Sequence, residues 1–140
     1  GLTYSGHPLA CAAAVATINA MEDAGMEANA ARIGEKVLGP GLHELARKHP
    51  SVGEVRGLGV FWAIELVSDP KTREPLAPYG GTSPAMNDVV AACKSGGMLP
   101  FSNFNRIHAC PPCNVTDAEI AEGLAILDAA LDVADKHVVS

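Results

Sequence analysis

Two cysteines with metal-ligand spacing lie near the C-terminal end of the chain, where positions 110–113 read CPPC. Such a pair could bind zinc or form a redox disulfide, but a structural zinc site takes four ligands. The sequence contains no second pair, since Cys11 and Cys93 each stand alone in apolar segments, where cysteine acts as a small hydrophobic residue. We therefore predict no metal site, and reduced thiols that are typical of a cytoplasmic protein.

Composition excludes several classes of function. The 140 residues carry a formal net charge of −6, and the ten Lys and Arg residues are scattered rather than clustered, which argues against nucleic-acid binding. The longest apolar run, 9–16, is too short to span a bilayer, so no membrane association is expected. The chain begins with Gly rather than Met, and no basic, apolar leader follows. We expect the sequence to be an internal part of a longer protein.

Hydrophobic periodicity predicts the elements that position these residues. Apolar residues recur at helical spacing in 27–49, whereas Val60, Trp62, Ile64 and Leu66 alternate with other residues as in a strand. The order of elements is typical of an α+β fold, in which helices cover one face of a small, largely antiparallel sheet. The predicted helices span 8–24, 27–49, 84–95 and 117–136, and the predicted strands span 52–58, 60–67, 98–101 and 106–110.

Three local features refine this outline. The long N-terminal helix, 8–24, is apolar on nearly every face, so we expect it to be deeply buried. Pro40 lies within the second helix and should kink or break it, because proline lacks a backbone N–H. Thr116 and Glu119 have the spacing of a capping box, which predicts the start of the last helix.

Three segments of the chain resemble class III (omega-type) aminotransferases. They are GLTYSGHPLACAAA at 1–14, VRGLGVFWAIEL at 55–66 and PPCNVTDAEI at 111–120, and they occur in the family's order and spacing. The resemblance implies that 1–140 is the C-terminal small domain of a fold type I enzyme that uses pyridoxal 5'-phosphate (PLP). Within it, 1–25 would form a phosphate-contact turn and an interdomain helix. Family members are homodimers or homotetramers with active sites at subunit interfaces.

The resemblance assigns a cofactor contact to Thr3. In the family, the threonine of this segment reaches the PLP phosphate of the neighbouring subunit. A hydroxyl and nearby backbone N–H groups suit a phosphate dianion. The alternative is that Thr3 and Ser5 only shape the turn before the first helix.

The lysine that forms the Schiff base with PLP lies upstream of the Thr3 segment in the family, and so does the aspartate that pairs with the pyridine nitrogen. An amine that acts as a nucleophile must be placed at the cofactor and desolvated. None of the lysines of this chain lies in a matching motif, so we predict no catalytic residue here. These lysines are Lys36, Lys48, Lys71, Lys94 and Lys136.

Arg106 is the candidate substrate-binding residue. Several family members hold the substrate carboxylate with an arginine on the strand before the Pro-rich segment, and a guanidinium suits this role because it binds a carboxylate through two hydrogen bonds. In other members the arginine falls earlier, near Phe101, where this chain has none. The alternative is an arginine at a strand edge, paired with an acid.

The resemblance therefore implies a parent transaminase that moves an amino group from an amine or amino acid donor to a 2-oxo acid acceptor. The segment alone would be inactive. Related class III members include racemases and decarboxylases. The alternative is a non-catalytic α+β module that binds a protein partner through its apolar first helix.

Overall fold

The fold is built on a small antiparallel sheet. The computed structural model describes residues 1–139 and orders four strands as β1-β2-β5-β4, with the short β3 paired to β2. The strand predicted at 98–101 begins only at Phe101, because Pro100 has no N–H to donate to a neighbouring strand. The strands are β1 (Val52–Leu58), β2 (Phe61–Asp69), β3 (Glu74–Pro75), β4 (Phe101–Asn103) and β5 (Arg106–Ala109).

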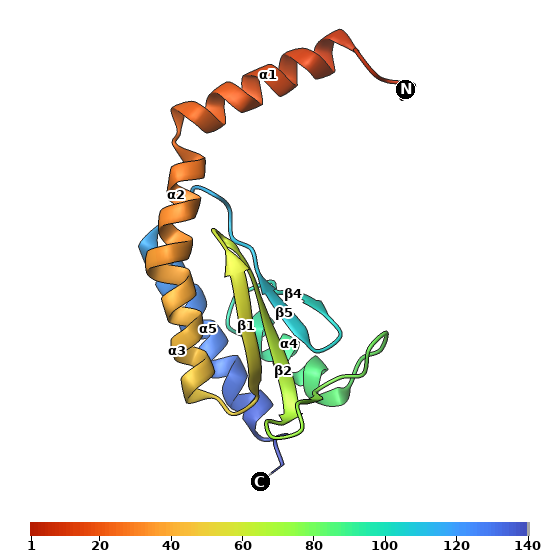
Figure 1. Cartoon of the computed structure of the whole chain (residues 1–140), viewed down its shortest axis with the longest axis vertical. Helices are drawn as coiled ribbons and strands as arrows, with labels where there is room; N and C mark the ends of the chain where they lie inside the picture. The colour runs from red at the N-terminus through yellow and green to blue at the C-terminus, as the bar shows by residue number, and fades with distance from the viewer. Residues whose placement is uncertain (140) are drawn as a thin grey trace.

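Helices lie on one side of this sheet, and Figure 1 shows α4 and α5 behind the strands with α2 and α3 alongside. The prediction of an α+β fold with a helix-covered antiparallel sheet is confirmed. The helical elements are α1 (Pro8–Asp23), α2 (Met26–Ile33), the π-helical stretch η1 (Gly34–Leu38), α3 (Gly39–Lys48), α4 (Pro84–Ser95) and α5 (Asp117–Asp135).

The core lies between the helices and the inner face of the sheet. Trp62, Ile64 and Leu66 of β2 are buried there, and Ile64 is paired with the buried Ile107 of β5. Successive strand residues face opposite sides, so from Phe61 to Leu66 the alternation buries every second side chain of β2 and leaves the others on the open face. The predicted alternation therefore identified the inner face of the central strand.

The segment from Met26 to Lys48 forms one line of helix with a π-helical middle. The expected kink or break at Pro40 takes the form of η1, which immediately precedes this proline. The N–H of Gly39 donates to the carbonyl of Gly34, five residues back rather than four. A π-type turn widens the helix locally, which accommodates a proline ring that would otherwise clash with the preceding turn.

A close contact between two glycines holds this helix line on the β1–β2 hairpin. Gly34 of η1 lies against the backbone of Gly59, which turns the hairpin with a φ of 54°. The carbonyl of Gly59 also accepts a 2.7 Å hydrogen bond from the indole N–H of Trp62. A side chain at Gly34 would occupy the position of that carbonyl, so only glycine allows the two backbones to approach this closely.

The last helix begins as its sequence predicts. The Thr116 hydroxyl accepts from the backbone N–H of Glu119, and the Glu119 carboxylate accepts from the backbone N–H of Thr116 at 2.8 Å. This reciprocal pair satisfies two donors that a helix start leaves free. It sets the start of α5, whose inner residues pack against α4.

The expectation that the first helix is deeply buried is wrong for this chain. No residue of α1 is buried, and Figure 1 shows α1 extending away from the body to the N-terminus. Its apolar composition indicates that it needs a cover, but composition does not say which surface supplies one. Among residues 1–139, no helix combines the length and apolarity needed to cross a membrane.

The contact at Gly34 yields a stability prediction. Gly34→Ala should lower the free energy of unfolding by about 1–3 kcal/mol or more, because the new Cβ overlaps backbone atoms that have no room to move. Gly123→Ala in α5 is the matched control, since a Cβ there meets nothing within 4 Å and should stabilise the helix by up to about 1 kcal/mol. Urea unfolding measures both, and equal stabilities would contradict the close-contact interpretation.

Candidate functional site

The predicted phosphate-contact residue lies in a tight turn just before α1. The Ser5 N–H donates to the Leu2 carbonyl at 3.0 Å, and the Ser5 hydroxyl accepts from the Leu2 N–H at 3.2 Å. His7 caps the helix, since its Nδ1 accepts from the Ala10 N–H at 3.5 Å. Thr3 itself is exposed, and its hydroxyl has no hydrogen-bond partner within residues 1–139.

This turn has the donors that one side of a phosphate needs. The Thr3 hydroxyl can donate outward, and Gly6, with a φ of 74°, has no atom within 4 Å of where a Cβ would lie. The N-terminus of α1 adds the partial positive charge of a helix start. The residues fit a phosphate group, and in the described part of the chain no other element contacts this turn to complete an enclosed site.

The predicted substrate residue lies elsewhere, on the open face of the sheet. Arg106 is half-buried on β5, opposite Glu65 of β2, and its guanidinium carbon lies 5.7 Å from the centre of the Phe104 ring. Figure 1 shows the N-terminal turn at the far end of α1, away from β5. One copy of this chain therefore does not bring Thr3 and Arg106 together.

Charges on the open face leave Arg106 without a close partner. The Glu65 carboxylate accepts a 2.6 Å bond from Arg56, and this bond lowers the pKa of Glu65 below its ordinary value, with the positive charge of Arg106 adding to the shift. Arg106 makes no ion pair within 4 Å among the described residues. Because Glu65 already neutralises Arg56, the guanidinium of Arg106 remains available to an added carboxylate.

The same face becomes apolar toward the hairpin tip. Leu58, Phe61 and Phe101 are exposed there, and the His108 ring lies 5.2 Å from Phe101 and 6.2 Å from Phe61 between ring centres. Partial burial lowers the pKa of His108, and the charges of Arg106 and Arg56 lower it further. The open face thus combines a cationic half with an aromatic half.

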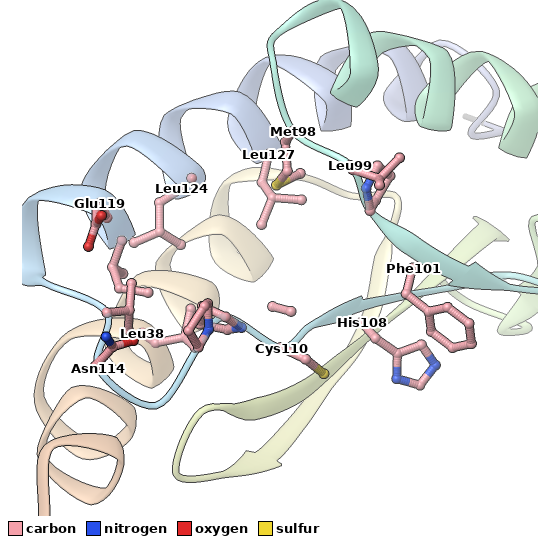
Figure 2. A pocket seen from close by; sticks show the side chains of 17 residues that line it. Leu38, Met98, Leu99, Phe101, His108, Cys110, Asn114, Glu119, Leu124 and Leu127 are labelled. Atoms are coloured by element: carbon pink, nitrogen blue, oxygen red, sulfur yellow. The ribbon is translucent and has the colours of Figure 1, made fainter. Parts of the chain in front are cut away.

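A cleft of about 530 Å³ lies beside this aromatic end. Figure 2 shows side chains from β4, β5 and α5 around it, with Phe101 and His108 near one end and Leu124 and Leu127 on the α5 side. Its lining is mainly apolar. The sequence did not predict this cleft, because its walls come from segments far apart in the chain, which hydrophobic periodicity treats as separate elements.

The two cysteines of the CPPC segment are both exposed, and both are free thiols. One group of three potential metal-ligand side chains lies close together in residues 1–139, and it contains His49, Asp132 and Asp135 rather than a cysteine. The spacing of Cys110 and Cys113 therefore coincides with no ligand cluster.

A comparison with protein families decides the identity of the chain. The family model "Aminotransferase class-III" matches residues 1–131. The chain belongs to the class III aminotransferases. The predicted membership, which depended on three segments of sequence, is confirmed.

Individual class III relatives cover almost all of this chain. It is 34% identical to 4-aminobutyrate aminotransferase GabT of Escherichia coli, across 96% of this chain and 30% of that protein. It is 34% identical to ethanolamine-phosphate phospho-lyase homolog 1 of Caenorhabditis elegans, across 96% of this chain and 28% of that protein. The chain thus spans less than a third of the length of these relatives.

A solved class III structure confirms the fold. Taurine:2-oxoglutarate aminotransferase from Bifidobacterium kashiwanohense, in complex with PLP and glutamate, superposes with a TM-score of 0.89 at 36% identity. The match covers 99% of this chain and 31% of that one. The helix-covered antiparallel sheet is therefore a recognised part of a class III enzyme.

Proposed function

We propose that this chain is the C-terminal small domain of a PLP-dependent transaminase, which moves an amino group from an amine or amino acid to a 2-oxo acid. The observation that carries the proposal is the family match over residues 1–131. In this proposal the domain spans 1–140, and 1–25 comprises the phosphate-contact turn and an interdomain helix. The parent would be a cytoplasmic enzyme.

Bound PLP supplies the electron sink on which amino-group transfer depends. The role of this chain is to bind and orient. The Thr3 hydroxyl would donate to the phosphate, and the backbone N–H groups at the start of α1 would add to that contact. The exposed position of Thr3 and its unpaired hydroxyl support this role.

The lysine that carries the coenzyme would come from another part of the parent. All five lysines here are exposed, and Lys48 is paired with Asp128 at 2.6 Å. A nucleophilic amine must be desolvated at the cofactor, and none of these exposed amines has such surroundings. The segment alone would therefore be inactive.

Arg106 would hold the carboxylate of the substrate. Its lack of an ion pair, its position beside the aromatic end of the open face and the bidentate geometry of guanidinium support this role. The competing interpretation is that Arg106 only balances the charge of Glu65 across the strand pair. The glutamate bound in the Bifidobacterium structure makes a carboxylate ligand reasonable for a relative of this chain.

The parent would assemble as a homodimer or homotetramer. Thr3 and Arg106 lie apart in one chain, and α1 exposes Leu9, Val15 and Ile18, which favours a neighbouring subunit as the cover. The same exposed helix also supports a second candidate, a non-catalytic module that binds a protein partner. One relative is named as a phospho-lyase homolog, so a reaction other than transamination is a further alternative for the parent.

The prediction that no lysine of this chain binds the coenzyme can be tested on the chain itself. Incubation with PLP at neutral pH followed by borohydride should leave no adduct that prefers one lysine over the others, because all five are exposed and none lies in a desolvated site that would hold the cofactor. Peptide mass spectrometry identifies the product, and the full-length parent serves as the positive control. A specific adduct at one lysine of this chain would contradict the proposal.

The phosphate contact can be tested in the full-length parent. Thr3→Ala should weaken PLP retention by roughly 1–3 kcal/mol, because the hydrogen bond from its hydroxyl to the anionic phosphate is lost. Thr17→Ala is the matched control, since the Thr17 hydroxyl already donates to the Ala13 carbonyl within α1 at 2.8 Å. Equilibrium dialysis measures retention, and unchanged affinity in the Thr3 variant would remove it from the site.

The substrate contact can be tested with a charge-conserving change in the parent. Arg106→Lys should raise KM for the carboxylate substrate about tenfold or more, since Lys keeps the charge but loses the two-pronged geometry. Arg47→Lys on the exposed side of α3 is the control, because Glu44 is the one acid that pairs with Arg47 among the residues that the structure describes. A KM equal to that of the control variant would favour the charge-balancing role instead.

A further inference from the structure

A histidine with both ring nitrogens bound to acids lies at the corner between α3 and β1. The side chain of His49 is only 1% exposed. Its Nδ1 lies 2.7 Å from Asp135, and its Nε2 lies 2.8 Å from Asp128. Both acids belong to α5, so one ring connects the end of α3 to the C-terminal half of a helix about eighty positions later.

The geometry determines the protonation of this ring. Ionised carboxylates only accept hydrogen bonds, and a neutral imidazole has a single N–H to donate. With a neutral ring, one carboxylate would face a bare nitrogen lone pair at hydrogen-bond distance inside the protein. Both contacts are favourable only when the ring is a doubly protonated imidazolium.

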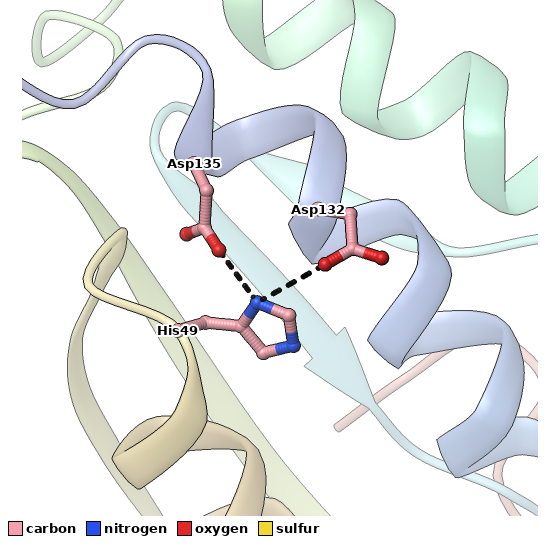
Figure 3. Close-up of side chains that lie close together, drawn as sticks. All are labelled: His49, Asp132 and Asp135. Atoms are coloured by element: carbon pink, nitrogen blue, oxygen red, sulfur yellow. Dashed lines mark hydrogen bonds and ion pairs between the residues drawn. The ribbon is translucent and has the colours of Figure 1, made fainter.

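The three acids of α5 around the ring favour that state, and Figure 3 shows two of them, Asp132 at 3.9 Å from Nδ1 and Asp135 at 2.7 Å. Lys48 of α3 opposes it with its own positive charge, although this ammonium is itself bonded to Asp128 at 2.6 Å. Burial by itself would lower the pKa of His49, but the hydrogen bonds and charges of Asp128 and Asp135 outweigh it and raise the pKa above 6.5. The hydrogen bonds of Lys48 and His49 lower the pKa of Asp128, so this acid remains ionised.

A metal ion does not fit this cluster as it stands. His49, Asp132 and Asp135 each offer one ligand atom within 4.8 Å of the others. However, a tetrahedral zinc ion with ligands about 2.0–2.2 Å away holds them farther apart than the 2.7 Å between Nδ1 and Asp135. That separation is the length of a charged hydrogen bond. Asp135 is also engaged by the Ser51 hydroxyl at 2.6 Å and the Ser51 N–H at 3.1 Å.

We propose that His49 is a proton-operated clasp, in which the imidazolium ties the α3–β1 corner to α5 and alkaline pH opens one of its two attachments. Opening would not unfold the corner. Asp135 keeps both Ser51 donors, and Asp128 keeps Lys48. The segment beyond α5 has its own contact with the sheet, since the Val139 N–H donates to the Ser68 carbonyl near the end of β2 at 2.8 Å.

The direction of the pH effect follows from the raised pKa of His49. The folded state binds this proton more tightly than the unfolded state does. The stabilisation is fully present below pH 6.5 and is lost as the pH rises through the higher pKa of the folded protein. The clasp is therefore closed below pH 6.5 while Asp128 and Asp135 remain ionised, and it loosens as the pH rises through the pKa of His49 in the folded protein.

An NMR titration of the 140-residue chain with labelled histidine tests the protonation directly. At pH 6.5 both ring nitrogens of His49 should carry protons, and their titration midpoint should lie above 6.5. Asp128→Asn should lower that midpoint while the fold is retained, because it removes one charge and keeps the shape of the side chain. A midpoint at or below 6.5, or a ring with one protonated nitrogen at pH 6.5, would overturn the proposal.

Unfolding experiments test the coupling to stability. The stability difference between the unmodified chain and His49→Gln should be largest in acid and should shrink as the pH rises. His137→Gln, which changes an exposed histidine just beyond α5, should leave that slope unchanged. Adding Zn²⁺ should not alter the ring signals of His49; a saturable zinc-dependent shift would overturn the proposal by making the ring a metal ligand.

Discussion

Burial of the inner side chains of β2 beneath the helices is the constraint on which the rest of this structure depends. Trp62, Ile64 and Leu66 fill the space between the sheet and the helices, and the neighbouring elements pack around them. The η1 stretch approaches through Gly34, whose missing side chain leaves room for the hairpin turn and the Trp62 indole hydrogen bond. Because this face is filled, the charged residues and the phenylalanines of the strands, Phe61 and Phe101, lie on the opposite face.

The division of the sheet into an apolar inner face and a more polar open face explains why much of the fold could be predicted from the sequence. The alternation in β2 is a local signal with period two, and the Thr116–Glu119 box is a local signal for a helix start. Family membership was predicted from three segments of sequence, and the class III family model, which matches residues 1–131, confirms it. The π-helical form of the Pro40 irregularity, by contrast, depends on the packing of Gly34 and Gly39 against the hairpin and on Trp62.

The candidate site was only partly predictable, for a physical reason. Thr3 and Arg106 were found by resemblance, and their roles stay proposals because one chain keeps them apart. The His49 cluster was missed, since its partners lie 79 and 86 positions away. Asp128, Asp132 and Asp135 do follow a helical stripe of acids, and that spacing is a signal that a search for a buried base could have used.

Because α1 is exposed, the stability of the fold and the tendency of the chain to aggregate should depend on different parts of the molecule. The buried core begins at Ile33 and ends at Ala134, so α1 contributes no side chain to it. The cooperative unfolding of the body should therefore be indifferent to this helix. The solubility of the chain should depend on this helix, because it exposes large apolar side chains that can associate with other molecules. They are Leu9, Val15, Ile18 and Met21. Aggregation of the isolated chain would thus report on an uncovered helix and not on a weak fold.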